Sequence, residues 1–125
     1  MGHGLTDEWA EALAAAEALK EEGRYEEAEQ AYACILRHDP QHAQARLGLG
    51  LVYCFTGRFD ESLEQMQEAT ERRPEWVDAH LQLGKTYAML GMVEEACREL
   101  RQVLSLHPGH PEASKQLSFL IGGNR

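Results

Sequence analysis

The sequence predicts an all-α solenoid built from antiparallel helix pairs. Three residue types each recur at steps of 34 residues. The glycines are Gly23, Gly57 and Gly91, the prolines are Pro40, Pro74 and Pro108, and the glutamates are Glu27, Glu61 and Glu95. A fixed period in this range is typical of repeat arrays, in which each unit buries its apolar face against its neighbours. No stretch of the chain shows the alternating pattern of a strand.

Each repeat predicts two helices that are separated by its glycine. Thr6 is the expected N-cap of the first helix, which runs to about residue 22. Gly23 ends that helix because glycine tolerates the left-handed conformation, and Pro40 ends the second helix because proline cannot continue the hydrogen-bond ladder. The remaining helices of the pairs are expected at residues 25–37, 43–55, 59–72, 77–90 and 93–106. The short turns FTGRF and MLGMV predict antiparallel neighbours.

A last helix, at residues 111–121, follows the three pairs and starts with Pro111 in its first turn. Its apolar residues can cover the open flank of the third pair, while its serines and lysine keep another side polar, as expected of a capping helix. The pattern predicts one domain over residues 1–125, with repeats at about 9–42, 43–76 and 77–110 and the capping helix at about 111–121.

Composition restricts the classes of partner. The 125 residues are 43% hydrophobic, enough for a sizeable core, and the formal net charge is −9. An acidic chain lacks the basic footprint that nucleic acids and anionic membranes require, so we expect neither as a partner. We expect no membrane span, because no apolar run is long enough. The odd, widely spaced Cys34, Cys54 and Cys97 indicate reduced, mostly buried thiols and a cytoplasmic location.

The repeats resemble the tetratricopeptide repeat family, whose pattern is W-x2-L-G-x2-Y, then A-x3-F, then P. The second repeat carries Leu49, Gly50, Tyr53, Ser62, Met66 and Pro74, and the third carries Leu83, Gly84, Tyr87, Ala96, Leu100 and Pro108. The first repeat matches less closely, and the family tryptophan is replaced by Ala12, Arg46 and His80. The resemblance covers about residues 9–121 and implies a right-handed superhelical solenoid that binds peptides in a concave groove lined by first helices.

The groove implied by this resemblance has apolar residues that the repeat pattern does not require. An exposed apolar patch usually marks a contact site, and a groove of this kind suits an amphipathic helix or an extended apolar segment. Lys85 is expected to orient the ligand by pairing with an acid or a carbonyl. The alternative is that some of these residues face the core or lie under the last helix. The predicted peptide-binding residues are Leu13, Leu47, Leu51, Phe55, Leu81, Gln82, Lys85, Met89 and Phe119.

Some members of the family bind the acidic C-terminal tails of heat-shock chaperones through basic and amide residues at set places in the first helices. Those places here hold Leu13, Glu17, Gly48, Asp78 and Gln82, none of which is basic. We therefore expect no binding of such tails.

Other chemistry receives little support from the sequence. His38 and His42 flank one turn, and His107 and His110 flank another, but no cysteine or carboxylate completes a recognisable zinc pattern. We expect no metal, no cofactor and no catalytic residue. The predicted function is a non-catalytic adaptor that binds an apolar peptide or amphipathic helix. The alternatives are a homo-oligomerisation module, or one domain excised from a larger enzyme or from a secretion-chaperone system.

Overall fold

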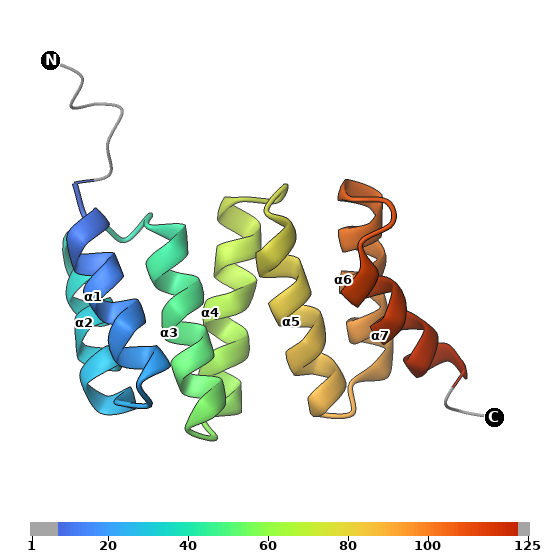
Figure 1. Ribbon diagram of the computed structural model, residues 1–125, viewed down its shortest axis with the longest axis horizontal. Helices are drawn as coiled ribbons and strands as arrows, with labels where there is room; N and C mark the ends of the chain where they lie inside the picture. The colour runs from blue at the N-terminus through green and yellow to red at the C-terminus, as the bar shows by residue number, and fades with distance from the viewer. Residues whose placement is uncertain (1–7, 123–125) are drawn as a thin grey trace, which may run out of the picture. The chain divides into compact units, whose positions relative to one another are not determined.

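The computed structural model describes residues 8–122, and the helices found there are those expected from the repeats, with no strand between them (Figure 1). Their bounds are α1 Ala10–Glu21, α2 Tyr25–His38, α3 Ala43–Phe55, α4 Phe59–Arg72, α5 Val77–Met89, α6 Val93–Leu106 and α7 Pro111–Gly122. They divide into two compact units, Met1–Arg72 with α1 to α4 and Arg73–Arg125 with α5 to α7. The single domain expected from the repeats therefore stays a prediction.

The first helix begins later than the sequence predicts. Thr6, the expected N-cap, lies outside the described residues, and Glu8 and Trp9 form a turn before α1 begins at Ala10. Trp9 takes the N-cap position, where its carbonyl accepts a hydrogen bond from the Leu13 N–H at 2.7 Å. Its ring lies 5.5 Å from the ring of His38, at the end of α2. The first helix therefore begins next to a residue that packs against α2, at a position that the local capping signal does not predict.

The repeated glycines close the helix–helix turns as the sequence predicts. Gly23 has φ +79°, and Gly57 and Gly91 have nearly the same value. The Gly23 N–H bonds to the Lys20 carbonyl at 3.0 Å, and the Arg24 N–H bonds to the Leu19 carbonyl at 2.9 Å. These two bonds form the Schellman arrangement, which satisfies the last carbonyls of α1 and needs a residue that adopts positive φ.

Small residues allow the paired helices to approach closely. A Cβ added at Gly50 of α3 would lie 3.3 Å from the backbone oxygen of Ser62 on α4. Ser62 is fully buried, and its hydroxyl donates to the Gly50 carbonyl at 2.7 Å. The serine thus satisfies its own polar group on a backbone acceptor, which makes it a tolerable replacement for the alanine of the other repeats.

Each unit has its own apolar core. In the unit of α1 to α4 the buried cluster consists of Leu13, Ala16, Ala28, Tyr32, Ile35, Ala45, Leu49 and Val52. In the unit of α5 to α7 it includes Leu81, Leu100, Val103 and Ala113. Ala113 lies on α7, which packs against α6 and α5, so the last helix covers the apolar side of its pair as expected of a capping helix.

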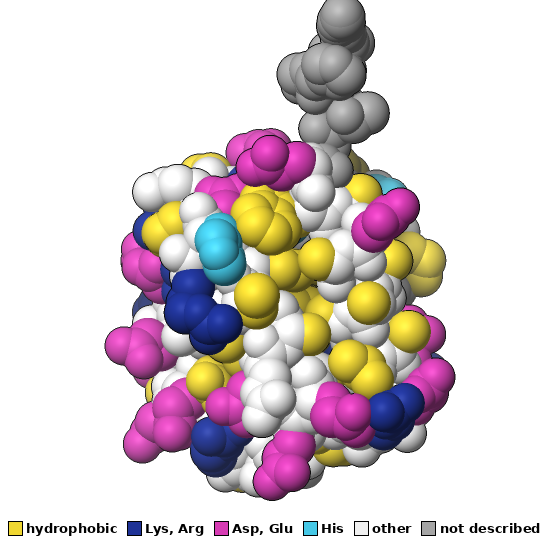
Figure 2. All heavy atoms as spheres, turned by 90° about the vertical axis from the view of Figure 1, so that its left-hand side faces the viewer, with side chains coloured by type: hydrophobic (Ala, Val, Ile, Leu, Met, Phe, Trp, Pro, Cys, Tyr) yellow, Lys and Arg dark blue, Asp and Glu magenta, His cyan; other side chains and the backbone are white. Residues whose placement is uncertain are grey.

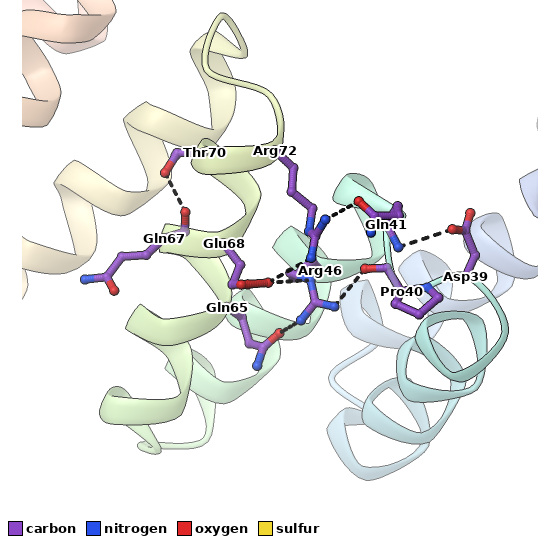
Figure 3. A network of polar contacts seen from close by, with 9 residues as sticks. All are labelled: Asp39, Pro40, Gln41, Arg46, Gln65, Gln67, Glu68, Thr70 and Arg72. Carbon is purple, nitrogen blue, oxygen red and sulfur yellow. Dashed lines mark hydrogen bonds and ion pairs between the residues drawn. The ribbon is translucent and has the colours of Figure 1, made fainter.

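A polar clamp occupies the position of the missing family tryptophan in the second repeat (Figure 3). The Arg46 guanidinium on α3 donates to the Pro40 carbonyl at 2.9 Å and to Oε1 of Gln65 on α4 at 2.8 Å. Glu68 of α4 lies 3.7 Å from Nε of Arg46, and Arg72 reaches from the end of α4 to the Gln41 side chain. One arginine therefore joins the turn before α3 to the second helix of the same pair.

His80 forms the corresponding clamp in the third repeat. Its Nε2 lies 2.7 Å from the Pro74 carbonyl oxygen, and its Nδ1 lies 2.8 Å from Oε1 of Glu99 on α6. The residues of the two clamps lie one repeat period apart. His80, Pro74 and Glu99 each follow Arg46, Pro40 and Gln65, respectively, by 34 residues. Hydrogen bonds thus hold the turn at a place where the family pattern has an apolar ring.

The outer surface of the first pair is partly apolar. Figure 2 shows this side of the molecule, with hydrophobic side chains gathered in the middle and acids toward the rim. The exposed apolar residues of α1 are alanines, namely Ala10, Ala12, Ala14, Ala15 and Ala18. Alanine offers little area to a partner, and these positions are explained by its high helix propensity.

None of the helices within residues 8–122 is both long and apolar enough to cross a membrane.

Candidate protein-binding surfaces

In the unit of α5 to α7, a lysine on α5 is joined to α7. The Lys85 ammonium forms an ion pair with Oε2 of Glu112 at 2.8 Å. The hydrogen bond from Lys85 is the main cause that lowers the pKa of the Glu112 carboxyl. The start of α7 is set by His110, whose Nδ1 accepts a hydrogen bond from the Ala113 N–H at 3.1 Å. Lys85, predicted to orient a ligand, already has an intramolecular acid, with which a ligand would have to compete.

One face of α7 is open and combines an aromatic ring with a cation. The residues that line a hollow there are Pro111, Glu112, Lys115, Gln116 and Phe119. Phe119 is 73% exposed, which is unusual for so large an apolar side chain. Met89, at the last turn of α5, is 57% exposed. Two of the large apolar side chains that this unit exposes, Met89 and Phe119, therefore lie at positions that the sequence predicts to bind a ligand.

Other predicted residues of this unit are less accessible. Leu81 is 5% exposed and belongs to the buried cluster with Leu100 and Ala113. Gln82 is half-buried, and its amide lies 3.4 Å from Oδ1 of Asp78, one turn earlier on α5. Leu81 thus holds α5 to α6 and α7, in accordance with the alternative of a core role.

The predicted residues of the first unit divide in the same way. Leu13 and Leu47 are buried, and Leu51 is half-buried. Phe55, at the end of α3, is 54% exposed, but its ring lies 5.6 Å from the ring of Tyr25 in a tilted arrangement. The predicted residues that offer substantial apolar area are therefore Phe55, Met89 and Phe119, and a binding role for any of the nine stays a prediction.

A tyrosine that the sequence does not single out as a binding residue brings a polar atom close to α3. Tyr32 of α2 is fully buried, and its hydroxyl has no hydrogen-bond partner among residues 8–122. A Cβ at Gly48 of α3 would lie 2.3 Å from the Tyr32 ring and 2.7 Å from its hydroxyl oxygen. Gly48 is thus required because the tyrosine fills the space of a side chain. The helical position of Gly48 alone carries no signal for this contact.

Two carboxylates of α1 act on this hydroxyl. Burial is the main cause that raises the pKa of Tyr32, and the charges of Glu17 and Glu21 add to the increase. Glu17 is half-buried and Glu21 exposed, and neither side chain forms an ion pair or hydrogen bond within the described part of the chain. The Tyr32 hydroxyl and the Glu17 and Glu21 carboxylates therefore have no cation paired with them within the described residues.

The histidines that the sequence suggests as possible metal ligands have other contacts. His42 caps α3, with its Nδ1 accepting from the Ala45 N–H, and His38 Nδ1 lies 3.0 Å from the Cys34 carbonyl oxygen. The rings of His107 and His110 meet edge to face at 5.1 Å. Within residues 8–122 no group of three or more histidine, cysteine or acidic side chains could hold a metal ion. The three cysteines are free thiols, and Cys97 alone of them is buried, whereas the sequence predicts mostly buried thiols.

Comparison with known proteins gives a consistent result for the fold. Two family models described as tetratricopeptide repeat match residues 7–80 and residues 77–120. None of the curated proteins matches the sequence closely enough to count as a relative.

Solved structures resemble nearly the whole chain. The first TPR of Spaghetti (RPAP3), bound to the HSP90 peptide SRMEEVD, has a TM-score of 0.84 at 20% identity over 90% of each chain. The Yersinia enterocolitica chaperone SycD with a YopD peptide has a TM-score of 0.84 at 17% identity, over 96% of this chain and 97% of that one. The second TPR domain of human RPAP3, with the HSP70 peptide SGPTIEEVD, has 0.80 at 23% identity, over 88% and 92%.

Proposed function

Because this chain belongs to the tetratricopeptide repeat family, we propose that it is a non-catalytic interaction scaffold that binds an apolar peptide or amphipathic helix of a partner protein. The observation that carries the proposal is the exposure of Phe119 and Met89. Neither side chain is needed for the packing of the repeat, and exposed apolar area of this kind commonly marks a contact site. Met89 lies on α5 and Phe119 on α7, so both residues belong to the unit of α5 to α7.

The similar structures support an interaction role. Three of the similar chains were solved with an HSP90 peptide, an HSP70 peptide and a peptide of a translocator. At identities near 20% the likeness concerns the fold, so the chemistry of the partner must come from the residues of this chain. An amphipathic helix would place apolar side chains at i, i+3 and i+4 against Met89 and Phe119 and leave its polar side in water.

The test replaces exposed apolar residues without disturbing the core. A peptide is first selected from a random displayed library on the folded chain, and its affinity is measured by fluorescence polarisation. Met89→Glu combined with Phe119→Glu should weaken binding by at least about tenfold, since each buried aromatic or methionine contact is worth about 1.5–3 kcal/mol. Ile121→Glu is the matched control, because Ile121 is 50% exposed and lies outside the hollow on α7.

Unchanged far-UV circular dichroism in all variants shows that they fold. Full affinity in the double variant, or an equal loss in the control, would contradict the assignment of the binding surface.

Self-association is the second candidate, because the same exposed side chains could contact a second copy. SycD, one of the similar proteins, has been solved as an alternative dimer. Light scattering over a range of concentrations separates the two functions. A scaffold of the proposed kind is monomeric without its partner, whereas a self-assembling module gains mass as the concentration rises.

A further inference from the structure

The Tyr32 hydroxyl is a buried polar group that lacks a partner. It is inaccessible to solvent and has no hydrogen bond within residues 8–122. Leaving a buried hydroxyl unsatisfied costs about 1–3 kcal/mol, and native structures seldom accept this cost without a ligand, an ion or a water at the site. The hydroxyl therefore points to a group that binds from outside the chain.

Packing fixes the place of this hydroxyl. The end of the tyrosine ring lies where a side chain of Gly48 would be, so the ring cannot swing toward α3. Leu13 of α1 packs in the same cluster as Tyr32. Glu17 and Glu21 follow Leu13 at steps of four residues, which places all three on one stripe of α1. The carboxylates therefore continue the α1 stripe that begins at the core contact of the tyrosine.

The Tyr32 hydroxyl and the carboxylates of Glu17 and Glu21 together have more hydrogen-bond acceptors than donors. Glu17 and Glu21 offer four carboxylate oxygens, and the hydroxyl offers lone pairs and one proton. Lys20, the nearest cation along α1, makes no side-chain ion pair within the described residues. An alkyl ammonium group has three donors and no acceptor, so it could donate one hydrogen bond to each carboxylate and one to the hydroxyl oxygen.

We propose that Tyr32, Glu17 and Glu21 form a binding site for the side-chain ammonium of a lysine in the partner protein. A lysine is favoured over a chain terminus because its long, thin stem can reach a hydroxyl that lies beneath the surface, and over an arginine because its charge is compact. The net charge of −9 favours a basic partner as well. The site rests on the proposed function and extends it, since the partner protein then supplies a lysine as well as an apolar segment.

The experiment uses small probes on the full chain. Amide resonances of the isotope-labelled protein are followed by NMR during titration with Nα-acetyl-lysine amide. The expected result is a saturable shift centred on Glu17, Glu21 and Gly48. The same probe acetylated on its ε-nitrogen has no charge and should give no such shift. Glycine amide presents only a terminal ammonium, and tighter binding of glycine amide than of the lysine probe would reject the lysine side chain.

Variants test the three residues. Glu17→Gln with Glu21→Gln should weaken the lysine probe by about tenfold, because two charge-assisted hydrogen bonds are lost. Tyr32→Phe keeps the ring and should weaken it severalfold. Glu11→Gln is the matched control on the same helix, since it removes an equal charge from an exposed acid outside the stripe. The proposal fails if the double variant binds as the native chain does, or if the control loses as much.

The test of the ammonium site can be distinguished from the test of the apolar binding surface. The probes have no large apolar group, so Met89→Glu with Phe119→Glu should bind the lysine probe normally. A chain that binds the probe but no apolar peptide would keep the ammonium site and reject the apolar surface. The reverse result would reject the ammonium site alone.

Discussion

At the scale of single residues, the contact between Gly48 and Tyr32 is the tightest constraint on α3. A methyl group at Gly48 would lie 2.3 Å from two ring carbons of a tyrosine that is fully buried. The end of a flexible side chain can often shift, but these carbons belong to a rigid ring that is fully buried. Replacing glycine by alanine inside a helix also gains about 1 kcal/mol from helix propensity. The sign of the effect therefore depends on whether the clash exceeds that gain.

We expect Gly48→Ala to destabilise the protein by about 1–2 kcal/mol net, because overpacking a tight core costs up to about 3 kcal/mol. Urea unfolding followed by circular dichroism measures the change. Gly84→Ala is the comparison, because its Cβ would meet Leu100 and Glu99 side chains at 3.3 Å, a distance that small shifts relieve.

A double-mutant cycle tests the cause. Tyr32→Leu should cost less in the Gly48→Ala background than in the native chain, since it removes the clashing ring. Additive losses would mean that the ring is not the origin of the effect.

At the scale of helix pairs, the clamps of Arg46 and His80 hold the turns that precede α3 and α5. His80→Ala would remove the two ring nitrogens that contact the Pro74 carbonyl oxygen and the Glu99 carboxyl group. We expect a loss of about 1–3 kcal/mol in the free energy of unfolding, the usual penalty for an unsatisfied buried group. Arg46→Ala should cost a similar amount, because it removes the donor of both Pro40 and Gln65.

The decisive variant is His80→Arg, which introduces the residue of the preceding repeat. If the clamp is a hydrogen-bonded tie, arginine should retain most of the stability that alanine loses, as measured by thermal unfolding. Should arginine be as destabilising as alanine, the imidazole would be acting through its packing.

The helices and the turns of this chain could be predicted well from sequence, because glycine, proline and helical periodicity are local signals. The predicted start of the first helix, after an N-cap at Thr6, was wrong. The helix begins after Trp9, whose ring contacts His38 at the far end of the next helix, and a local capping signal carries no information on such a contact. The clamps were not predicted, since the pattern identifies Arg46 and His80 only as departures from the family tryptophan. Periodicity also cannot tell whether a first-helix leucine such as Leu81 faces the core or a ligand, because a helix packed on two sides has apolar residues on both.

At the scale of the whole molecule, the net charge of −9 restricts the ligands that suit this chain. Acids outnumber basic residues by 21 to 12, and within residues 8–122 the carboxylates of the half-buried Glu17 and the exposed Glu21 form no ion pair. A shared fold at 20% identity does not transfer a ligand, because recognition of an acidic peptide depends on cations placed against its carboxylates. The same fold with an acidic surface favours basic ligands and disfavours acidic ones.

We therefore expect no binding of SRMEEVD, the peptide held by the first TPR of Spaghetti (RPAP3). The peptide would bring its acids and its C-terminal carboxylate to a chain of net charge −9, whose first helices offer Glu17 and Asp78 at the places where cations would be needed. Calorimetry should detect no heat of binding. The control peptide SRMQQVN, with amides in place of the acids, should bind no more weakly than SRMEEVD. Added salt should reduce any difference between them, because it screens the repulsion of exposed charges. Low-micromolar binding of SRMEEVD would show that the acidic surface does not select against such tails.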